Sequence, residues 1–180
     1  MDPMEGVVRR GEVLVLAQRS LRRRDYGLRR GDGEVGWLRF PPGRRAIARA
    51  GGDHTGVLTL TATRGVVEVR GAEGGGALVA TVERAGRGAR LIRTTHGSAA
   101  RWRKTGWHRW VIVAGETELL GFTGAQGLLK SSVRITARQD LPGPAGMLLC
   151  VIGGFLALRE LQAEVDGSAS VGGIVATGAG

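Results

Sequence analysis

The sequence predicts a mainly β protein, a sandwich or a barrel of about 12 short strands, followed by one hydrophobic helix. Two observations predict the strands. Between Glu12 and Arg138, apolar and polar residues alternate in short runs, and glycine-rich turns separate those runs. Glycine supplies 32 of the 180 residues and asparagine none, so glycine must provide most of the positive φ angles that tight hairpins need. The helix is predicted by a continuous apolar run near the C-terminus.

The clearest strand is Val57–Thr63, which places Leu58, Leu60 and Ala62 on one face and threonines on the other. A second apolar run, 66–70, follows after the two residues Arg64 and Gly65, a spacing that suits a hairpin. The same alternation predicts further strands at 13–17, 25–29, 35–40, 46–50, 78–83, 89–94, 100–104, 110–113, 118–123 and 133–138. No long amphipathic helix separates these runs, so a βαβ arrangement is not expected.

The pattern changes after residues 141–144, Leu-Pro-Gly-Pro, and residues 145–164 form the predicted helix. This segment is apolar on all sides until Arg159, which is typical of a helix buried in protein or in lipid. Its fully apolar part, 145–158, is shorter than the roughly 20 residues that span a bilayer. Length therefore favours a core helix over a membrane helix. If the helix is a core helix, a bulky residue at Gly154 would overpack it, at a cost of about 1–3 kcal/mol.

These elements divide the chain into a flexible N-terminus (1–11), one folded domain (12–164) and a disordered Gly/Ala-rich tail (165–180). Cys150 is the only cysteine, which excludes an intramolecular disulfide, and its apolar neighbours indicate a buried thiol. The first ten residues lack the apolar segment of a secretory signal. We therefore expect a cytoplasmic protein.

A run of about 12 strands followed by one wholly apolar helix resembles the tubby C-terminal-like superfamily, which includes LURP-one-related proteins and phospholipid scramblases. The order of the strands, the extended segment 25–28, the strands that carry Trp37 and Trp110, and the segment 144–158 carry the resemblance. It implies a closed antiparallel barrel with the hydrophobic helix through its centre. The alternative is a β-sandwich with a C-terminal membrane helix. No phosphoinositide-binding motif and no calcium-binding feature of scramblases can be matched residue by residue.

Two basic segments are the candidate binding sites. In the first, Arg101, Arg103, Lys104 and Arg109 alternate with tryptophans, a pattern that could bind lipid phosphates or nucleic acid. The second is the run Arg22, Arg23, Arg24. The alternative for both is a set of solvated arginines, with the tryptophans of the first segment packed into the barrel. The formal charge of +10, with 24 of the 26 basic residues arginine, also fits the composition bias of a GC-rich genome.

No catalytic, metal-binding or nucleotide-binding motif is present, so we expect neither an enzyme nor a cofactor. The sequence favours a non-enzymatic binding or scaffold protein of tubby-like type, whose partner is an anionic phospholipid surface that it contacts as a peripheral membrane protein. A membrane protein inserted through the C-terminal helix is one alternative, and a nucleic-acid-binding barrel is another.

Overall fold

The computed structural model describes residues 7–20, 23–43, 45–50, 56–71, 76–127 and 130–172. These residues form twelve strands and one helix. In chain order they are β1 (Val13–Ser20), β2 (Arg23–Arg30), β3 (Gly33–Arg39), β4 (Arg45–Ala50), β5 (Val57–Thr63), β6 (Val66–Gly71), β7 (Leu78–Arg84), β8 (Ala89–Thr94), β9 (Ala99–Gly106), β10 (Arg109–Ala114), β11 (Thr117–Gln126), β12 (Ser131–Ala137) and α1 (Gly143–Gly172).

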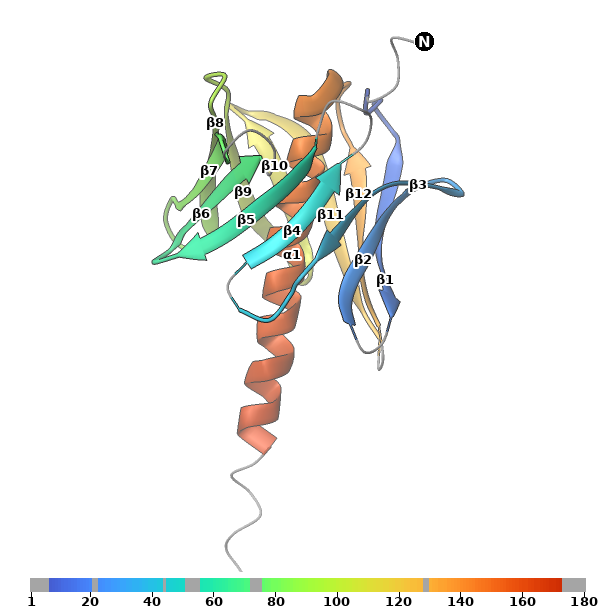
Figure 1. The fold of residues 1–180 in the computed structure, drawn as a ribbon, viewed down its shortest axis with the longest axis vertical. Helices are drawn as coiled ribbons and strands as arrows, with labels where there is room; N and C mark the ends of the chain where they lie inside the picture. Colours follow the sequence, from blue (N-terminus) through green and yellow to red (C-terminus); the bar gives the residue numbers. More distant parts are fainter. Residues whose placement is uncertain are drawn as a thin grey trace, which may run out of the picture.

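The strands close into one barrel (Figure 1). Each strand pairs antiparallel with the next one in the chain, and β1 pairs with β12 in a register that sets Leu14 opposite Ile135. Closure leaves no sheet edge unpaired. The predicted barrel is confirmed, and the alternative of a β-sandwich is wrong because the first and last strands pair with each other.

Alternation along the strands fills the interior, as the sequence predicts. In β5, Leu58 and Leu60 are buried, with 6% and 0% of their surface exposed, while the threonines lie on the opposite face. In the paired strand β6, Val67 and Val69 are buried in the same way. The inner wall is therefore a ring of apolar side chains, aliphatic and aromatic, around a central space.

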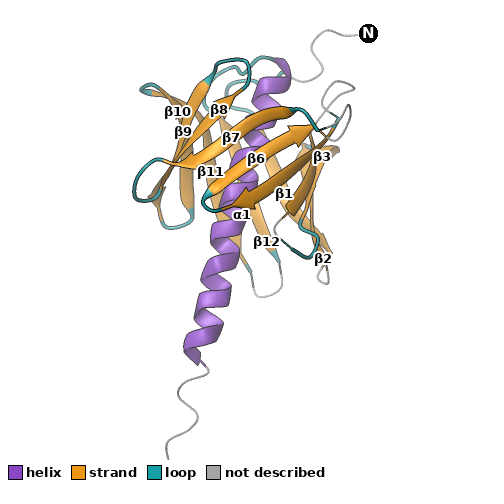
Figure 2. Ribbon diagram, turned by 60° about the vertical axis from the view of Figure 1, so that its left-hand side comes forward, coloured by secondary structure: helices purple, strands orange, loops and turns teal. Residues whose placement is uncertain are grey.

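The helix α1 fills that space and runs on beyond one end of the barrel (Figures 1 and 2). It begins two residues before the predicted start at 145 and ends eight residues after the predicted end at 164, so residues 165–172 are helical rather than part of a tail. Of the residues that the structure describes, only Gly143–Asp166 is long and apolar enough to cross a membrane, and 72% of its most apolar window is buried in the barrel.

Two glycines let the helix approach the barrel wall. A Cβ atom on Gly153 would lie 2.2 Å from Cζ of Phe122, and one on Gly154 would lie 2.9 Å from a methyl group of Leu16. Any larger side chain would overlap packed atoms at these positions. The helix is thus a core element, as its length favoured.

The N-terminal boundary differs from the prediction. Val8 pairs with Leu141 through two backbone hydrogen bonds of 3.1 and 2.8 Å, and its side chain is fully buried. Residues 7–11 are therefore held by the barrel, which does not fit a flexible segment reaching residue 11. Residues 1–6 and 173–180 lie outside the described residues.

Candidate functional site

The up-and-down order of the strands divides the turns between two ends of the barrel. We call the end where α1 emerges the arginine end; it carries the turns β1–β2, β3–β4, β5–β6, β7–β8, β9–β10 and β11–β12. The end where α1 begins is called the apolar end. Basic side chains flank or occupy every turn of the arginine end; those described are Arg19, Arg24, Arg39, Arg45, Arg64, Arg84, Arg87, Arg90, Lys104, Arg109 and Lys130. At the apolar end, the turn after β8 carries no acidic, lysine or arginine residue and the turn after β10 carries Glu116.

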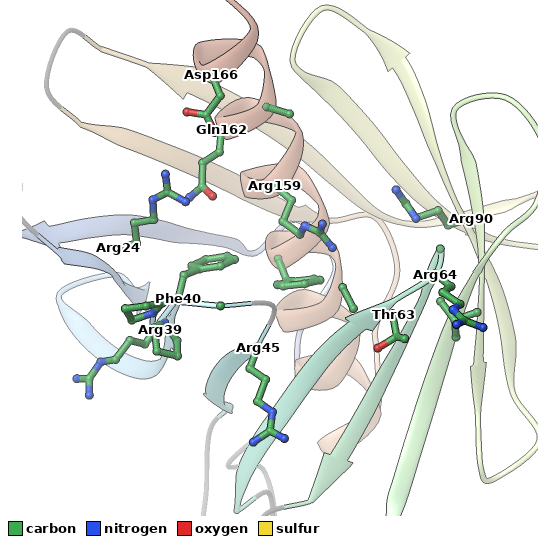
Figure 3. A pocket seen from close by; sticks show the side chains of 18 of the residues that line it. Arg24, Arg39, Phe40, Arg45, Thr63, Arg64, Arg90, Arg159, Gln162 and Asp166 are labelled. Atoms are coloured by element: carbon green, nitrogen blue, oxygen red, sulfur yellow. The ribbon is translucent and has the colours of Figure 1, made fainter. Parts of the chain in front are cut away.

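A cleft of about 1110 Å³ opens at the arginine end, between α1 and the strands β2 to β8 (Figure 3). Seven arginines line it, and they come from seven separate elements or turns. They are Arg24, Arg39, Arg45, Arg64, Arg84, Arg90 and Arg159. Asp166 is the only acidic residue among the described lining residues. The wall of the cleft is therefore strongly cationic.

The cleft exists because hydrogen bonds hold α1 against the opposite side of the barrel. The indole Nε1 of Trp110 donates to Glu160 at 2.8 Å, and His108 and Glu164 share a hydrogen bond of 2.7 Å. The side-chain amide of Gln126 donates to the carbonyl of Leu161 at 3.0 Å. These bonds tie the emerging helix to β10 and β11, which leaves space on the side of β4 to β8.

Two stacked aromatic rings form an apolar part of the cleft. Phe40, after β3, and Phe155, on α1, lie with ring centroids 5.6 Å apart and planes at 8°. The guanidinium of Arg159 lies 5.6 Å from the centre of the Phe155 ring, a cation–π arrangement. The ring fixes the direction of the Arg159 side chain without neutralising its charge.

Most of the cleft arginines have no carboxylate partner among the described residues. Arg39 pairs with the buried Asp25 at 3.3 Å, and Arg19 shares that carboxylate. Within the part of the chain that the structure describes, the other six form no ion pair. Burial lowers the pKa of Arg90; the carboxylate of Glu160 opposes this effect, while the positive charges of Arg159 and Arg84 add to it. All the guanidinium groups stay protonated at neutral pH, so they repel one another across the cleft.

This arrangement has the chemistry to accept anions. A guanidinium presents several N–H donors in a planar fork that matches the oxygens of phosphate and carboxylate. Six guanidinium groups without an ion-pair partner among the described residues surround one cleft, which suits a ligand with more than one phosphate-type group.

Cys150 is not an accessible nucleophile, because it is fully buried and burial raises its pKa to about 12. Among the described residues, no group of three or more His, Cys, Asp or Glu side chains could hold a metal ion.

The structure separates the residues of the first predicted patch. Arg101 and Arg103 are exposed on the outer face of β9, and Arg109 is exposed at the start of β10. Lys104 instead contacts Glu164 of α1 at 3.4 Å. Trp102 and Trp110 are buried and stacked, as the alternative interpretation expected, whereas Trp107 at the hairpin tip is 77% exposed.

The second predicted run falls partly outside the described residues. Arg22 lies outside them, and Arg23 is described only as the first residue of β2. Arg24 lines the cleft, so it alone among the predicted site residues whose side chains are described belongs to the cluster. The other six cleft arginines lie far apart in the sequence; five of them lie at the turns β3–β4, β5–β6 and β7–β8, and Arg159 lies on α1.

Comparisons with protein-family models, with curated proteins and with solved structures find no match to this chain.

Proposed function

We propose that this protein is a non-enzymatic binding protein that takes a ligand bearing phosphate groups into the arginine cleft. One observation carries the proposal: six guanidinium groups without an ion-pair partner in the described chain surround a single concave site. Bringing like charges together costs free energy, and an anion that binds among them recovers it. The volume of the cleft is at the upper end of the range for small-molecule sites.

The partly exposed Phe40 ring, which stacks on the buried Phe155, supports a ligand with an apolar part beside its phosphates. Phospholipid headgroups and free phosphorylated metabolites share this chemistry. A headgroup as ligand would make the protein a peripheral protein of a cytoplasmic membrane surface. A closed barrel around an apolar helix is the architecture that the tubby-like resemblance implies, and we propose membership of that superfamily on the architecture alone.

A narrow cleft favours such a ligand over nucleic acid. Nucleic-acid surfaces usually combine an extended basic groove with exposed aromatic rings for base stacking. Here the arginines converge into a concave site, and Phe155 is 2% exposed. If the protein bound single-stranded DNA with the same affinity as inorganic triphosphate, that result would contradict the proposal.

The test compares two double variants that lose the same charge. Arg90→Gln with Arg159→Gln removes two cleft guanidiniums, and Arg101→Gln with Arg103→Gln removes two from the outer face of β9. Inorganic triphosphate is titrated by calorimetry. Vesicles of phosphatidylcholine, with or without phosphatidic acid, are tested by co-sedimentation.

We expect the cleft pair to weaken binding at least tenfold, because each lost charge-assisted hydrogen bond is worth about 1.5–3 kcal/mol. The control pair should change binding by no more than about threefold. Equal losses in both pairs would mean unspecific attraction to a basic surface and would overturn the proposal. Cleft-dependent binding of triphosphate alone would identify a free metabolite, and cleft-dependent recruitment to vesicles alone would identify a headgroup.

A further inference from the structure

A second cavity, of about 590 Å³, lies at the apolar end of the barrel. It lies between the first turns of α1 and the inner wall of the sheet. On the helix side its lining includes Ala145, Leu148 and Leu149, and on the sheet side it includes Leu58 and Ile92. Neither the cleft nor the hydrogen bonds that hold the helix involve these residues.

The cavity exists because the start of α1 is held against the other side of the barrel. A Cβ atom on Gly146 would lie 2.7 Å from Cβ of Leu141, and Leu141 is itself paired with Val8. Ala145, Leu148 and Leu149, in the same first turns of the helix, border the cavity. Small wall residues such as Ala100 and Ala114 preserve the space.

The chemistry of the cavity is opposite to that of the cleft. None of its described lining residues is Asp, Glu, Lys or Arg. The side-chain hydroxyl of Thr94 already donates to the carbonyl of Ser98 and accepts from its N–H. His96 is exposed at the mouth. The interior therefore offers apolar contact, and polar groups lie only at the rim.

The wall of the cavity is broad and curved. Its lining residues come from seven neighbouring strands, β5 to β11. At the usual strand spacing this wall extends for roughly 28 Å around the barrel. A flexible chain can follow a curved wall of that length, whereas a rigid compact ring would fill only part of it.

We propose that this cavity binds one fatty acyl chain, with its head at the mouth beside His96 and Ser98. Ala145 and Ala163 are eighteen residues apart in α1, about 27 Å along the helix axis. Between the two sites, Ile152 and Leu156 are buried in the packed core. The acyl site is therefore separate from the cleft, and it does not depend on the proposed function.

The test uses the full chain and the same substitution at both ends of the helix. Ala145→Trp places an indole in the cavity, and Ala163→Trp places one in the cleft; both alanines are exposed, so both variants should fold. Ala99→Trp fills the cavity from a second exposed position, on the sheet side. It therefore distinguishes a filled cavity from a local disturbance of the helix start by Ala145→Trp. Thermal unfolding checks each variant.

Binding of octanoate, decanoate, dodecanoate and hexadecanoate is measured by calorimetry below their micelle-forming concentrations. We expect affinity to rise roughly fourfold per methylene until the cavity is full. Neutral dodecanol should bind as well, because the cavity presents no charge. Ala145→Trp and Ala99→Trp should each weaken dodecanoate at least tenfold, while Ala163→Trp should leave it unchanged and weaken triphosphate instead.

An affinity that does not depend on chain length would overturn the acyl proposal, and so would equal losses of dodecanoate in Ala145→Trp and Ala163→Trp. Loss of triphosphate binding in Ala145→Trp would show that the two ends are not separate sites. Absence of triphosphate binding in the unmodified protein would contradict the proposed function and leave the acyl proposal standing.

Discussion

The two ends of the barrel present one face of the same helix to opposite environments. At the apolar end this face carries Ala145, Leu148 and Leu149, and it borders a cavity without charged side chains among its described lining. At the arginine end it carries Arg159 and Asp166 and borders a cleft lined by seven arginines. Residues three, four or seven apart share a helix face, so a single stripe of α1 serves both sites.

The difference shows how the eccentric position of a core helix creates space at each end. The other face of α1 is held close to the wall by glycines and by hydrogen bonds from Trp110, His108 and Gln126. The space opposite that wall is filled in the middle of the barrel and open at its ends. What each end can bind then depends on the residues at the turns.

The largest effect should follow from disturbing the packed middle that separates the two ends. Gly153→Leu forces side-chain atoms into the buried Phe122 ring, and we expect it to lower the free energy of unfolding by about 3 kcal/mol or more. The better helix propensity of leucine offsets about 1 kcal/mol of the clash. Ala163→Leu, at an exposed position of the same helix, should change stability by less than about 0.5 kcal/mol. Urea unfolding measures both, and equal stability of the two variants would contradict the packing described here.

A second prediction concerns the repulsion stored at the arginine end. Arg90→Gln removes a half-buried charge beside Arg159 and Arg84, so it should raise the free energy of unfolding by about 0.5–1 kcal/mol. The same variant should bind triphosphate about tenfold more weakly. Unfolding without ligand and titration with triphosphate measure the two effects. A loss of stability would show that Arg90 is held by favourable contacts instead.

A smaller, pH-dependent effect should come from the contacts that hold the emerging helix. Partial burial alone would raise the pKa of Glu164, but hydrogen bonds from His108 and Lys104 outweigh it and leave that pKa below its ordinary 4.5. A carboxyl group with a lowered folded-state pKa stabilises the fold above its unfolded pKa and loses that contribution as the pH falls through the folded value. Glu164→Gln should therefore cost about 0.5–1 kcal/mol at pH 7.

Near pH 3 the stabilities of the Glu164→Gln variant and the unmodified protein should converge. Urea unfolding across the pH range checks this outcome. A difference that stays constant down to pH 3 would mean that the charge of Glu164 does not contribute.

The smallest effect should come from Trp107, which is 77% exposed at the tip of the β9–β10 hairpin. Trp107→Ala should change the free energy of unfolding by less than about 0.5 kcal/mol and leave triphosphate binding unchanged. Trp110→Ala is the matched comparison: its ring is buried and bonded to Glu160, so it should cost about 3–5 kcal/mol. A Trp107→Ala variant that binds triphosphate much more weakly would extend the site to the hairpin tip.

Local periodicity predicted the strands and the apolar helix, while closure into a barrel around that helix was predicted from the family resemblance. The alternation of Val57–Thr63 appears unchanged in β5, and the apolar run after Pro144 appears as α1. The limits of the helix were less accurate, because residues 165–172 have no apolar stripe to mark them as helical. The cleft could not be predicted in full, since closure brings together arginines as distant as Arg24 and Arg159. The run of basic residues at 101–109 predicted a binding patch, but alternation along β9 places Arg101 and Arg103 on the outer face of the barrel.

The pairing of β1 with β12 and the enclosure of α1 also determine when the protein can fold during synthesis. The first strand has no partner on one side until Ala137 has left the ribosome, and the core is empty until α1 has followed. Pairs this distant in sequence close slowly, because the loop entropy is lost before the contact forms. Until then, the inward leucines and valines of twelve strands face water without the helix that covers them. The earlier strands therefore depend on a segment that is synthesised after all of them, and the barrel cannot complete its core before α1 has been made.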